Sequence, residues 1–487
     1  MKTRQERAIV RLAAPEWDQL REIVLSRYPN LEWASFARFG WRMTPEGLLV
    51  TLAALDPPDF GDLDYRVGNV AIQEPYSLRI ALAAERHPLG VGVVHSHPRD
   101  CPPTPSRVDD DMDCYYATYF RDFAPRRPYV SLIVSILNGD IVVSGRVFWN
   151  GEWEPVARVL VSGGAECTWH PGEKAEQQGR ARTERLSIAF GTEAEMRLRR
   201  ATVAVIGAGG TGSAAIEALA RAGVGRLILV DPDAIEQSNL ERVHGSIPQD
   251  AERRRKKVSV GARHVRAIDP TIAVEALVGA LPQEEIVHRV VMADVVLGCT
   301  DQQHSRLALS DLALRYLVPV LDSGVMLEGS NGRVTGQILQ LVRFLPADAC
   351  ALCRGLTDPQ RVAQELMPET ERRQRRAAGM AAAQRGEVGN AYWRDLPQIN
   401  TVGYQTTVAG AMQAGYAIGW IAGRFVPPFS RLQMNLVAPY LDITDVDQPP
   451  RDNCACRCFR GWADQARADA LITAPMHWRK PRAVEST

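Results

Sequence analysis

The segment VAVIGAGGTGS at residues 203–213 decides the fold of the larger part of the chain. A short apolar run precedes a glycine-rich turn, and the helical pattern SAAIEALARAG starts where the turn ends. A strand that enters a helix through such a turn brings backbone N–H groups close to a phosphate. The segment therefore predicts a nucleotide-binding loop formed by Gly207, Gly209, Gly210 and Gly212.

Strand and helix patterns alternate on the C-terminal side of this loop. Strand patterns at RLILVD, DVVLGC and VPVLDSGV are separated by helix patterns near 252–268 and at 304–317. This order is typical of parallel βαβ units. It predicts an α/β domain with a Rossmann-like, mainly parallel sheet.

Charged residues after the strand patterns indicate the chemistry of the loop. Asp231 ends the second strand pattern, where a carboxylate commonly binds ribose hydroxyls, and to this point a nicotinamide-dependent oxidoreductase would look the same. The discriminating residues that follow are Asp233, Asn239, Arg242, Lys257 and Asp301. Hydride transfer does not need this set. A reaction at the α-phosphate of ATP does, because cations offset charge on the phosphorus and a carboxylate holds Mg²⁺.

These residues resemble the ThiF/MoeB/ubiquitin-activating family over about 182–463. Members of that family adenylate the C-terminal glycine of ubiquitin-like proteins. The resemblance implies ATP and Mg²⁺ as cofactors and a ubiquitin-like or sulfur-carrier protein with a C-terminal glycine as partner. It also implies that the glycines form the nucleotide loop, that Asp231 binds ribose with Asp233 nearby, that Asn239, Arg242 and Lys257 contact phosphates, and that Asp301 coordinates Mg²⁺. Lys256 is an alternative to Lys257.

The same resemblance bears on assembly. In RTERLSIAFGTEAEMRLRR, Arg185 occupies the place of an arginine that reaches the γ-phosphate bound by the partner subunit in dimeric relatives. We therefore expect a homodimer.

The nine cysteines of this 487-residue chain are too few for a disulfide scaffold, and their clustering indicates a metal site. Cys350 and Cys353 form one half of a zinc knuckle that would hold the crossing segment at 357–395 to the sheet. The second half is CACRC, with Cys454, Cys456 and Cys458. We expect two of these three to complete a structural zinc tetrad, and the sequence leaves open which two.

Family members that pass the substrate on as a thioester carry a cysteine in the crossing segment. Residues 357–449 contain no cysteine. We therefore expect the adenylate to be handed directly to an acceptor, unless a cysteine elsewhere substitutes.

The first 160 residues predict a separate α+β domain. A helix pattern at 14–28 is followed by strand patterns at 48–55, 91–96, 130–137 and 141–149. The polar, glycine-rich stretch at 161–181 is the expected linker, and 464–487 the expected polar tail.

The motif HSHPRDCPPTPSRVD predicts a zinc site in this first domain. His95 and His97 are two residues apart on a strand, so their side chains share a face. After the proline-rich turn, Asp109 can supply a third ligand and leave one position for water. Zinc in such a site lowers the pKa of bound water and supplies a nucleophile for hydrolysis.

The pattern H-S-H-P followed by S-x-x-D resembles the JAMM signature of the JAB/MPN metalloproteases. These enzymes cleave isopeptide or peptide bonds after the C-terminal glycine of ubiquitin-like proteins. The resemblance implies that His95, His97 and Asp109 bind zinc and that Ser106 stabilises the oxyanion. The general base of the family is an upstream glutamate. Glu32 fits best, and Glu46, in a Thr-Pro-Glu-Gly turn, is its rival.

Both resemblances converge on one kind of partner. They imply a bifunctional enzyme that cleaves after the C-terminal glycine of a ubiquitin-like protein and adenylates that glycine with ATP. One alternative is an adenylyltransferase of a sulfur-transfer pathway whose first domain only binds the carrier. Another is a nicotinamide oxidoreductase with an accessory metal domain.

Composition excludes some other classes. Lys plus Arg and Asp plus Glu both total 57, so there is no net field to attract nucleic acid. The N-terminus has no apolar h-region, and the most apolar stretch, at 409–422, is too short to span a bilayer. The sequence predicts a cytoplasmic protein with neither a nucleic-acid nor a membrane partner.

Overall fold

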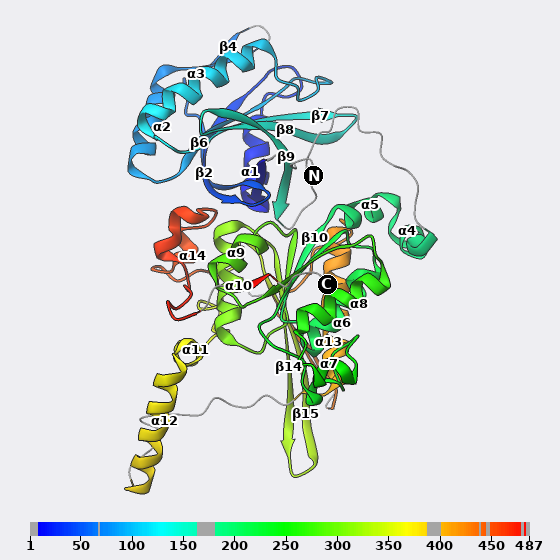
Figure 1. Ribbon diagram of the computed structural model, residues 1–487. Helices are drawn as coiled ribbons and strands as arrows, with labels where there is room; N and C mark the ends of the chain where they lie inside the picture. The colour runs from blue at the N-terminus through cyan, green and yellow to red at the C-terminus, as the bar shows by residue number, and fades with distance from the viewer. Residues whose placement is uncertain are drawn as a thin grey trace.

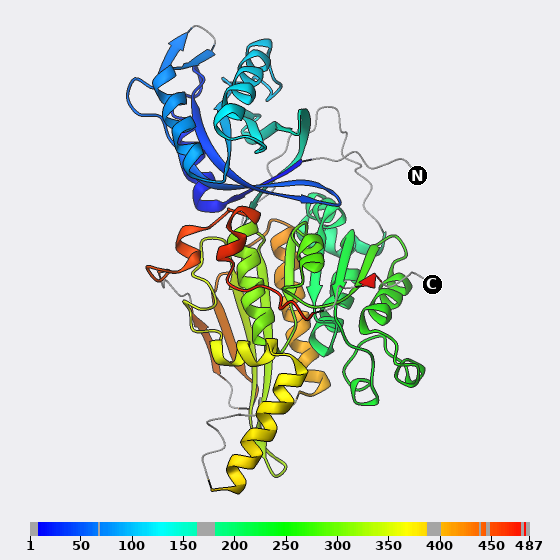
Figure 2. The same cartoon turned by 60° about the vertical axis from the view of Figure 1, so that its left-hand side comes forward.

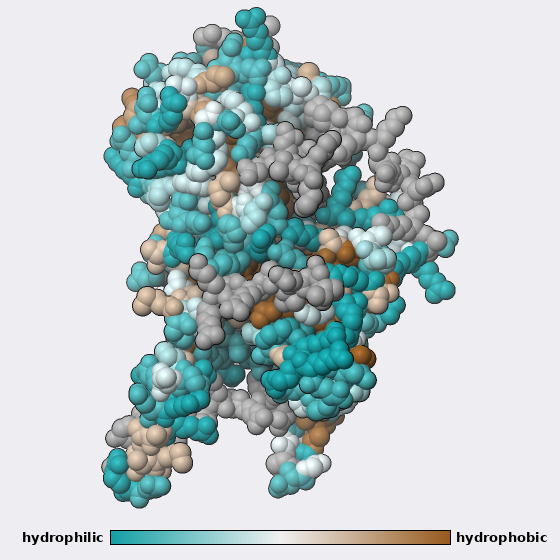
Figure 3. All heavy atoms as spheres, in the orientation of Figure 1, coloured by the Kyte–Doolittle hydropathy of each residue, from teal (hydrophilic) through white to brown (hydrophobic). Residues whose placement is uncertain are grey.

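The computed structural model describes residues 8–66, 69–162, 181–386, 401–437, 440–444, 449–478 and 482–483. They form two domains, one above the other in Figures 1 and 2. Hydrophilic side chains predominate on the face shown in Figure 3. Among the described helices, none has both the length and the apolar character needed to cross a membrane. The expected linker falls almost wholly outside the described residues.

The first domain is a closed seven-stranded barrel with three helices. In order around the barrel the strands are β1 (Ala8–Ala13), β3 (Gly47–Asp56), β2 (Ala34–Thr44), β6 (Gly90–Ser96), β7 (Tyr129–Leu137), β8 (Asp140–Trp149) and β9 (Glu152–Ser162). The helices are α1 (Ala14–Val24), α2 (Glu74–Arg86) and α3 (Arg107–Phe123), and a hairpin joins β4 (Leu63–Arg66) to β5 (Asn69–Ile72). The four predicted strand patterns coincide with β3, β6, β7 and β8.

Strand β6 shows how this domain is packed. Val94 lies in the barrel core, whereas Val91 and Val93 pack with residues of α2 and α3. Alternate residues of a strand face opposite sides, so a strand covered on both sides reads as one apolar run. His95 shares the parity of Val93, which directs it toward the start of α3.

The second domain is built on a nine-stranded sheet. Its order is β17 (Tyr440–Thr444), β16 (Arg431–Asn435), β15 (Arg333–Phe344), β14 (Val320–Ser330), β13 (Val295–Gly298), β10 (Thr202–Ile206), β11 (Arg226–Val230), β12 (Ala273–Val278) and β18 (Arg482–Ala483). The strands from β14 to β12 pair in parallel, and the others are antiparallel. The predicted Rossmann-like, mainly parallel fold is confirmed.

Helices cover both faces of this sheet. One face packs against α6 (Gly210–Arg221), α8 (Lys257–Ile268) and α13 (Gly403–Ile421), and the other against α9 (Glu284–Val290) and α10 (Gln303–Tyr316). The basic helix predicted near 252–268 is two helices, because the chain turns between α7 (Pro248–Glu252) and α8. The remaining helices are α4 (Glu184–Phe190), α5 (Thr192–Arg200), α11 (Pro359–Leu366), α12 (Glu369–Gln384) and α14 (Ala455–Cys458).

The crossing segment at 357–395 is helical over much of its described length. It contains α11 and α12, and α12 projects from the body of the domain (Figure 1). Most of the α12 side chains are exposed or half-buried, as is usual for a helix with a dense run of charged residues.

The first domain docks on the N-terminal ends of the parallel strands. Arg11 of β1 donates hydrogen bonds to the carbonyls of Val291 and Ala293, at 2.5 and 2.6 Å. Arg158 of β9 pairs with Asp294, just before β13, at 2.7 Å. Part of the expected polar tail also packs here and at the sheet edge: Asp464 accepts a hydrogen bond from Arg42 of the first domain, and β18 pairs with β12.

Candidate active sites

A pocket of about 450 Å³ opens at the C-terminal ends of the parallel strands, the end of the sheet opposite to the first domain. The loops after β10, β11 and β13 and the start of β14 form it. The predicted residues that line it are Gly207, Gly209, Gly210, Asp231, Asp233, Arg242, Lys257 and Asp301. Parallel strands bring their carboxyl ends to one edge, so residues far apart in the sequence meet there.

The glycine loop has the tight geometry that its sequence predicts. Gly207 has a φ of +96°, and its N–H donates to the Val230 carbonyl at 2.7 Å. A Cβ on Gly212 would lie 1.8 Å from the Gly207 oxygen. Gly212 does not line the pocket, but only glycine fits where the helix starts so close to the strand.

The carboxylate of Asp231 is fixed by the backbone of the loop. Its Oδ2 accepts from the N–H of Ala208 at 2.7 Å and its Oδ1 from the N–H of Asp233 at 2.8 Å. Burial raises the pKa of Asp231, while the charge of Lys257 opposes the shift. Lys257 donates to Asp233 at 2.8 Å and lines the pocket. The alternative, Lys256, is exposed and donates to the Pro232 carbonyl.

Two other predicted residues lie outside this pocket. Asn239 is buried, and its Oδ1 accepts from the N–H of Glu236, so it shapes the short 3-10 turn (Gln237–Asn239) that precedes Arg242. Arg185 is exposed on α4. Its predicted action on a partner subunit stays a prediction.

Sequence reasoning missed two cations of the pocket, Arg306 and Arg361. The Nε of Arg306 donates to Asp322 Oδ2 at 2.5 Å, and Asp322 is 1% exposed. The sequence contained one signal for Arg306. Asp322 stands inside the strand pattern VPVLDSGV, and a carboxylate buried in a strand requires a partner. Arg361 lies on α11 and donates to the Asp301 carbonyl at 3.4 Å, so the crossing segment contributes to this wall.

In the first domain, His95, His97 and Asp109 converge, and one ligand atom from each lies within 4.8 Å of the others. His95 Nε2 is 3.1 Å from Asp109 Oδ1, and His97 Nε2 is 3.6 Å from Asp109 Oδ2. The histidines come from the end of β6, and Asp109 from the first turn of α3.

The donor chemistry of this group fits a metal cation. His97 Nδ1 lies 3.0 Å from the Pro102 carbonyl, which fixes a proton on Nδ1 and leaves a lone pair on Nε2 facing a carboxylate oxygen. Among the described residues, Nδ1 of buried His95 has no hydrogen-bond partner, and its Nε2 faces the carboxylate of Asp109. Two imidazoles and a carboxylate are a common zinc ligand set.

The two candidate bases lie at opposite ends of β2. Glu32 precedes Ala34, which pairs with His95, and the N–H of Trp33 donates to Ser96 Oγ at 3.1 Å. Burial raises the pKa of Glu32, the Asp109 charge adds to the shift, and the two histidines oppose it. Glu46, in the turn after β2, pairs with Arg226 of the second domain at 2.7 Å.

Ser106 caps α3. Its Oγ accepts from the N–H of Asp109 at 3.3 Å, and its own N–H donates to Asp109 Oδ2 at 2.6 Å. This capping box orients the carboxylate toward the histidines. Ser106 is exposed, so its hydroxyl proton can still reach a ligand.

Four cysteines converge in the second domain: Cys350, Cys353, Cys454 and Cys456. The Sγ atoms of Cys350 and Cys454 are 3.4 Å apart, and those of Cys353 and Cys456 are 3.7 Å apart. Cys458, which we also considered as a ligand, is exposed at the end of α14 and outside the group. Two residues along a helix turn the side chain by about 200°, so Cys456 and Cys458 face opposite sides.

A family model described as the ThiF family matches residues 182–458 and does not extend into the first domain. The sulfur carrier protein ThiS adenylyltransferase of Bacillus subtilis is 31% identical over 29% of this chain and 43% of its own length. The SAMP-activating enzyme E1 of Haloferax volcanii is 33% identical over 33% of this chain and 56% of its own length. The chain thus spans about half the length of these relatives or less.

Among solved structures, E. coli MccB with ATP matches with 18% identity and a TM-score of 0.43. The match covers 58% of this chain and 75% of that one.

Proposed function

This chain belongs to the ThiF family, and from that premise we propose that residues 182–463 adenylate the C-terminal glycine of a ubiquitin-like sulfur-carrier protein. The observation that carries the proposal is the pocket that gathers Arg242, Lys257 and Asp301 around the glycine loop. The relatives named for ThiS and SAMP support a carrier of this kind. They favour the sulfur-transfer alternative over the bifunctional reading.

The residues of the pocket have distinct roles in this proposal. ATP with Mg²⁺ supplies an activated α-phosphate. The loop N–H groups from Gly207 to Gly210 bind phosphate oxygens, and Asp231 accepts from ribose hydroxyls. Arg242 and Lys257 offset the charge that develops on the phosphates, and Asp301 holds the metal.

ATP–pyrophosphate exchange in the presence of a carrier with a C-terminal glycine tests this proposal. We expect exchange in the wild type and a loss of about a hundredfold or more in Asp301→Ala, since removal of one preorganised electrostatic group has effects of that size. Arg373→Ala, on exposed α12, is the matched control and should exchange normally. Normal exchange in Asp301→Ala would refute the assignment.

Arg185 acts across a homodimer in this proposal. Arg185→Ala and Asp301→Ala are then each inactive alone, but a mixture that exchanges subunits recovers part of the activity, because one pocket of each mixed dimer is complete. No recovery in mixed dimers purified with two affinity tags would exclude a role across the interface.

A second candidate function belongs to residues 1–160, linked through 161–181 to the second domain. We propose a JAB/MPN-like zinc hydrolase, favoured by the convergence of His95, His97 and Asp109. Zinc would activate water there. Glu32 would take the proton from that water, and Ser106 would donate to the oxyanion.

Metal content and cleavage test this candidate together. His97→Ala should lose one zinc per chain and should no longer cleave a carrier precursor extended beyond its glycine, while exchange at the ATP site persists. If His97→Ala retains its zinc, the ligand assignment fails. If the wild type binds zinc there without cleaving, the first domain only binds the carrier.

A further inference from the structure

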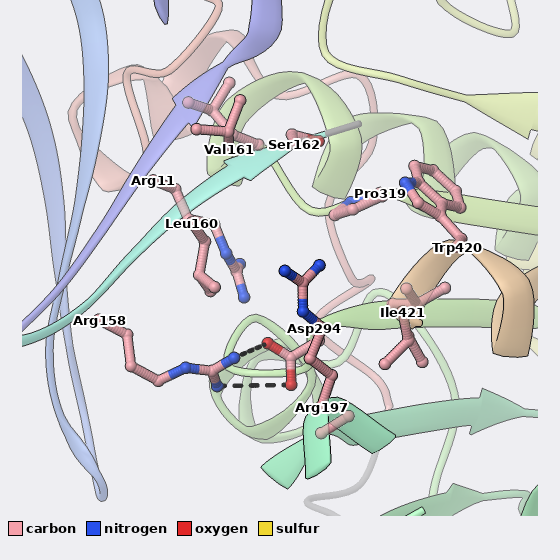
Figure 4. A pocket seen from close by; sticks show the side chains of 13 residues that line it. Arg11, Arg158, Leu160, Val161, Ser162, Arg197, Asp294, Pro319, Trp420 and Ile421 are labelled. Atoms are coloured by element: carbon pink, nitrogen blue, oxygen red, sulfur yellow. Dashed lines mark hydrogen bonds and ion pairs between the residues drawn. The ribbon is translucent and has the colours of Figure 1, made fainter. Parts of the chain in front are cut away.

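A second pocket lies at the junction of the two domains, away from both sites described above. It has a volume of about 80 Å³. Arg11 of β1 and Arg158 of β9 enter it from the first domain, and Arg197 of α5 and Trp420 of α13 from the second. Figure 4 shows the three guanidinium groups directed into one space beside Asp294.

The carboxylate of this pocket is already used. Asp294 Oδ1 accepts from Arg158 at 2.7 Å. Its Oδ2 accepts from the N–H of Thr202 at 2.7 Å and from the second Arg158 nitrogen at 3.4 Å. Asp294, the one acidic residue among the described residues that line the pocket, is therefore committed to Arg158 and to the sheet.

Among the described residues, the other two guanidinium groups find no carboxylate in the pocket besides Asp294. Arg11, 1% exposed, donates to neutral carbonyls of Val291, Ala293 and Tyr316. These carbonyls follow or end α9 and α10, so helix dipoles offset part of its charge. Arg197 pairs at 2.7 Å with Glu193, whose side chain is 63% exposed, so that pairing is screened by water.

Within the part of the chain that the structure describes, the charges of Arg11 and Arg197 at this junction are compensated only in part. Burial lowers the pKa of Arg11 to about 10; Asp294 counters the shift and Arg158 adds to it. A buried charge without a full counter-charge is costly, and an anion among the three arginines would relieve that cost. Guanidinium groups bind oxyanions through paired N–H donors.

We propose that the junction pocket binds a phosphate-type oxyanion, which bridges Arg11 and Arg158 of the first domain to Arg197 of the second. The volume suits a tetrahedral anion or a small carboxylate and is too small for a nucleotide. Leu317, Pro319 and Ile421 cover part of the remaining wall, and the polar groups on the described lining include the three arginines and the buried hydroxyl of Ser162. The bound anion holds the two domains together.

Thermal unfolding of the full chain tests the proposal. At constant ionic strength, inorganic phosphate in place of chloride should raise Tm by a few degrees with saturation, as expected for a ligand of the native state. Sulfate should act similarly. Pyrophosphate, which the proposed adenylation releases, is a further arm of the test. Only an anion small enough for this pocket should raise Tm through Arg197, so pyrophosphate should raise it less than phosphate does.

Variants locate the effect. Arg197→Gln should remove the phosphate-dependent rise in Tm, since it removes the cation that the second domain contributes to the pocket. Arg373→Gln is the control, because Arg373 has the same pairing with a glutamate four residues earlier but lies on α12. Arg242→Gln distinguishes phosphate binding at the junction pocket from phosphate binding at the nucleotide pocket, because Arg242 lines only the latter.

A rise that persists in Arg197→Gln and disappears in Arg242→Gln would overturn the proposal, as would equal stability in phosphate and chloride. A rise lost in Arg197→Gln and kept in both other variants would support it.

Discussion

The carboxylate of Glu46 accepts a hydrogen bond from Arg226 at 2.7 Å, across the interface between the domains. Arg226 also pairs with Glu275 of the second domain at 2.7 Å. Glu46 is thus held at the end of β2 that docks, whereas Ala34, at the other end, pairs with His95. Ala34 and Arg42, which lies on β2 near the turn that holds Glu46, are about 26 Å apart along the strand at roughly 3.3 Å per residue. Glu46 is therefore too far from His95 and His97 to act as the general base for a water molecule bound beside them.

Glu32→Gln should abolish precursor cleavage while zinc content stays unchanged, because the base is not a ligand. Glu46→Gln keeps the size of the side chain but weakens the contact with Arg226. It should leave cleavage intact and lower Tm slightly, since a partly buried ion pair contributes modestly to stability. Cleavage assays and zinc analysis on both variants check this. Inactivity of Glu46→Gln with normal zinc would reverse the assignment.

Cys350→Ser should reduce bound zinc by one per chain and lower Tm, because Cys350 belongs to the converging group of four. A closed tetrahedral zinc site contributes directly to folding. Cys458→Ser is the matched control from the same motif and should change neither quantity. Zinc measured by mass spectrometry of the native protein distinguishes the two. Equal loss from both variants would show that Cys458 can replace a member of the group.

Parallel strands β10, β11, β13 and β14 were predictable because each begins with or consists of a buried apolar run and they are separated by helices, whereas β12, whose residues are mostly half-buried, was not predicted. The glycine loop, Asp231 and Asp301 follow these strands directly, so the local order of residues was enough to place them. The convergence of His95, His97 and Asp109 could be predicted in the same way, from the alternation of side chains along a strand and from one short turn. Each of these predictions needed only short-range sequence information.

Other features depend on contacts that no local pattern encodes. The barrel closes through parallel pairing of Val10 with Val159, residues far apart in the chain. Helix α13 is rich in small residues and packs closely on α6, where a Cβ on Gly410 would lie 2.2 Å from the Thr211 carbonyl. Its sequence therefore reads as an apolar stretch without a clear period. The Arg306–Asp322 pair and the contacts of Arg11 also join distant segments.

We expect no stable thioester on this protein. Cys299 lines the nucleotide pocket, but burial raises its pKa, the charge of Asp322 adds to the shift, and the hydrogen bond with Gln413 only partly opposes it. A protonated thiol is a poor nucleophile. Incubation with ATP and carrier followed by non-reducing gels should show no adduct that a thiol reductant removes. Such an adduct on Cys299 would contradict the expectation, and its loss in Cys299→Ser would prove the attachment site.

His244 should position Arg242, which lies two residues earlier. The backbone N–H of His244 donates to Ser213 Oγ at 3.0 Å, and the His244 ring contacts Glu217 at 2.8 Å and Thr407 at 3.0 Å. These contacts tie the Arg242 loop to α6 and α13. His244→Ala should lower exchange about tenfold, the effect of losing hydrogen bonds worth about 1.4 kcal/mol.

A double-mutant cycle separates this role from a general loss of stability. If His244 acts through Arg242, His244→Ala should have little further effect on exchange in an Arg242→Ala background. Arg221→Ala is the control, because Arg221 also pairs with Glu217, at 2.9 Å, but lies outside the loop. That variant should exchange normally. Equal effects of His244→Ala in both backgrounds would show that the histidine stabilises the fold without directing the arginine, since independent contributions add.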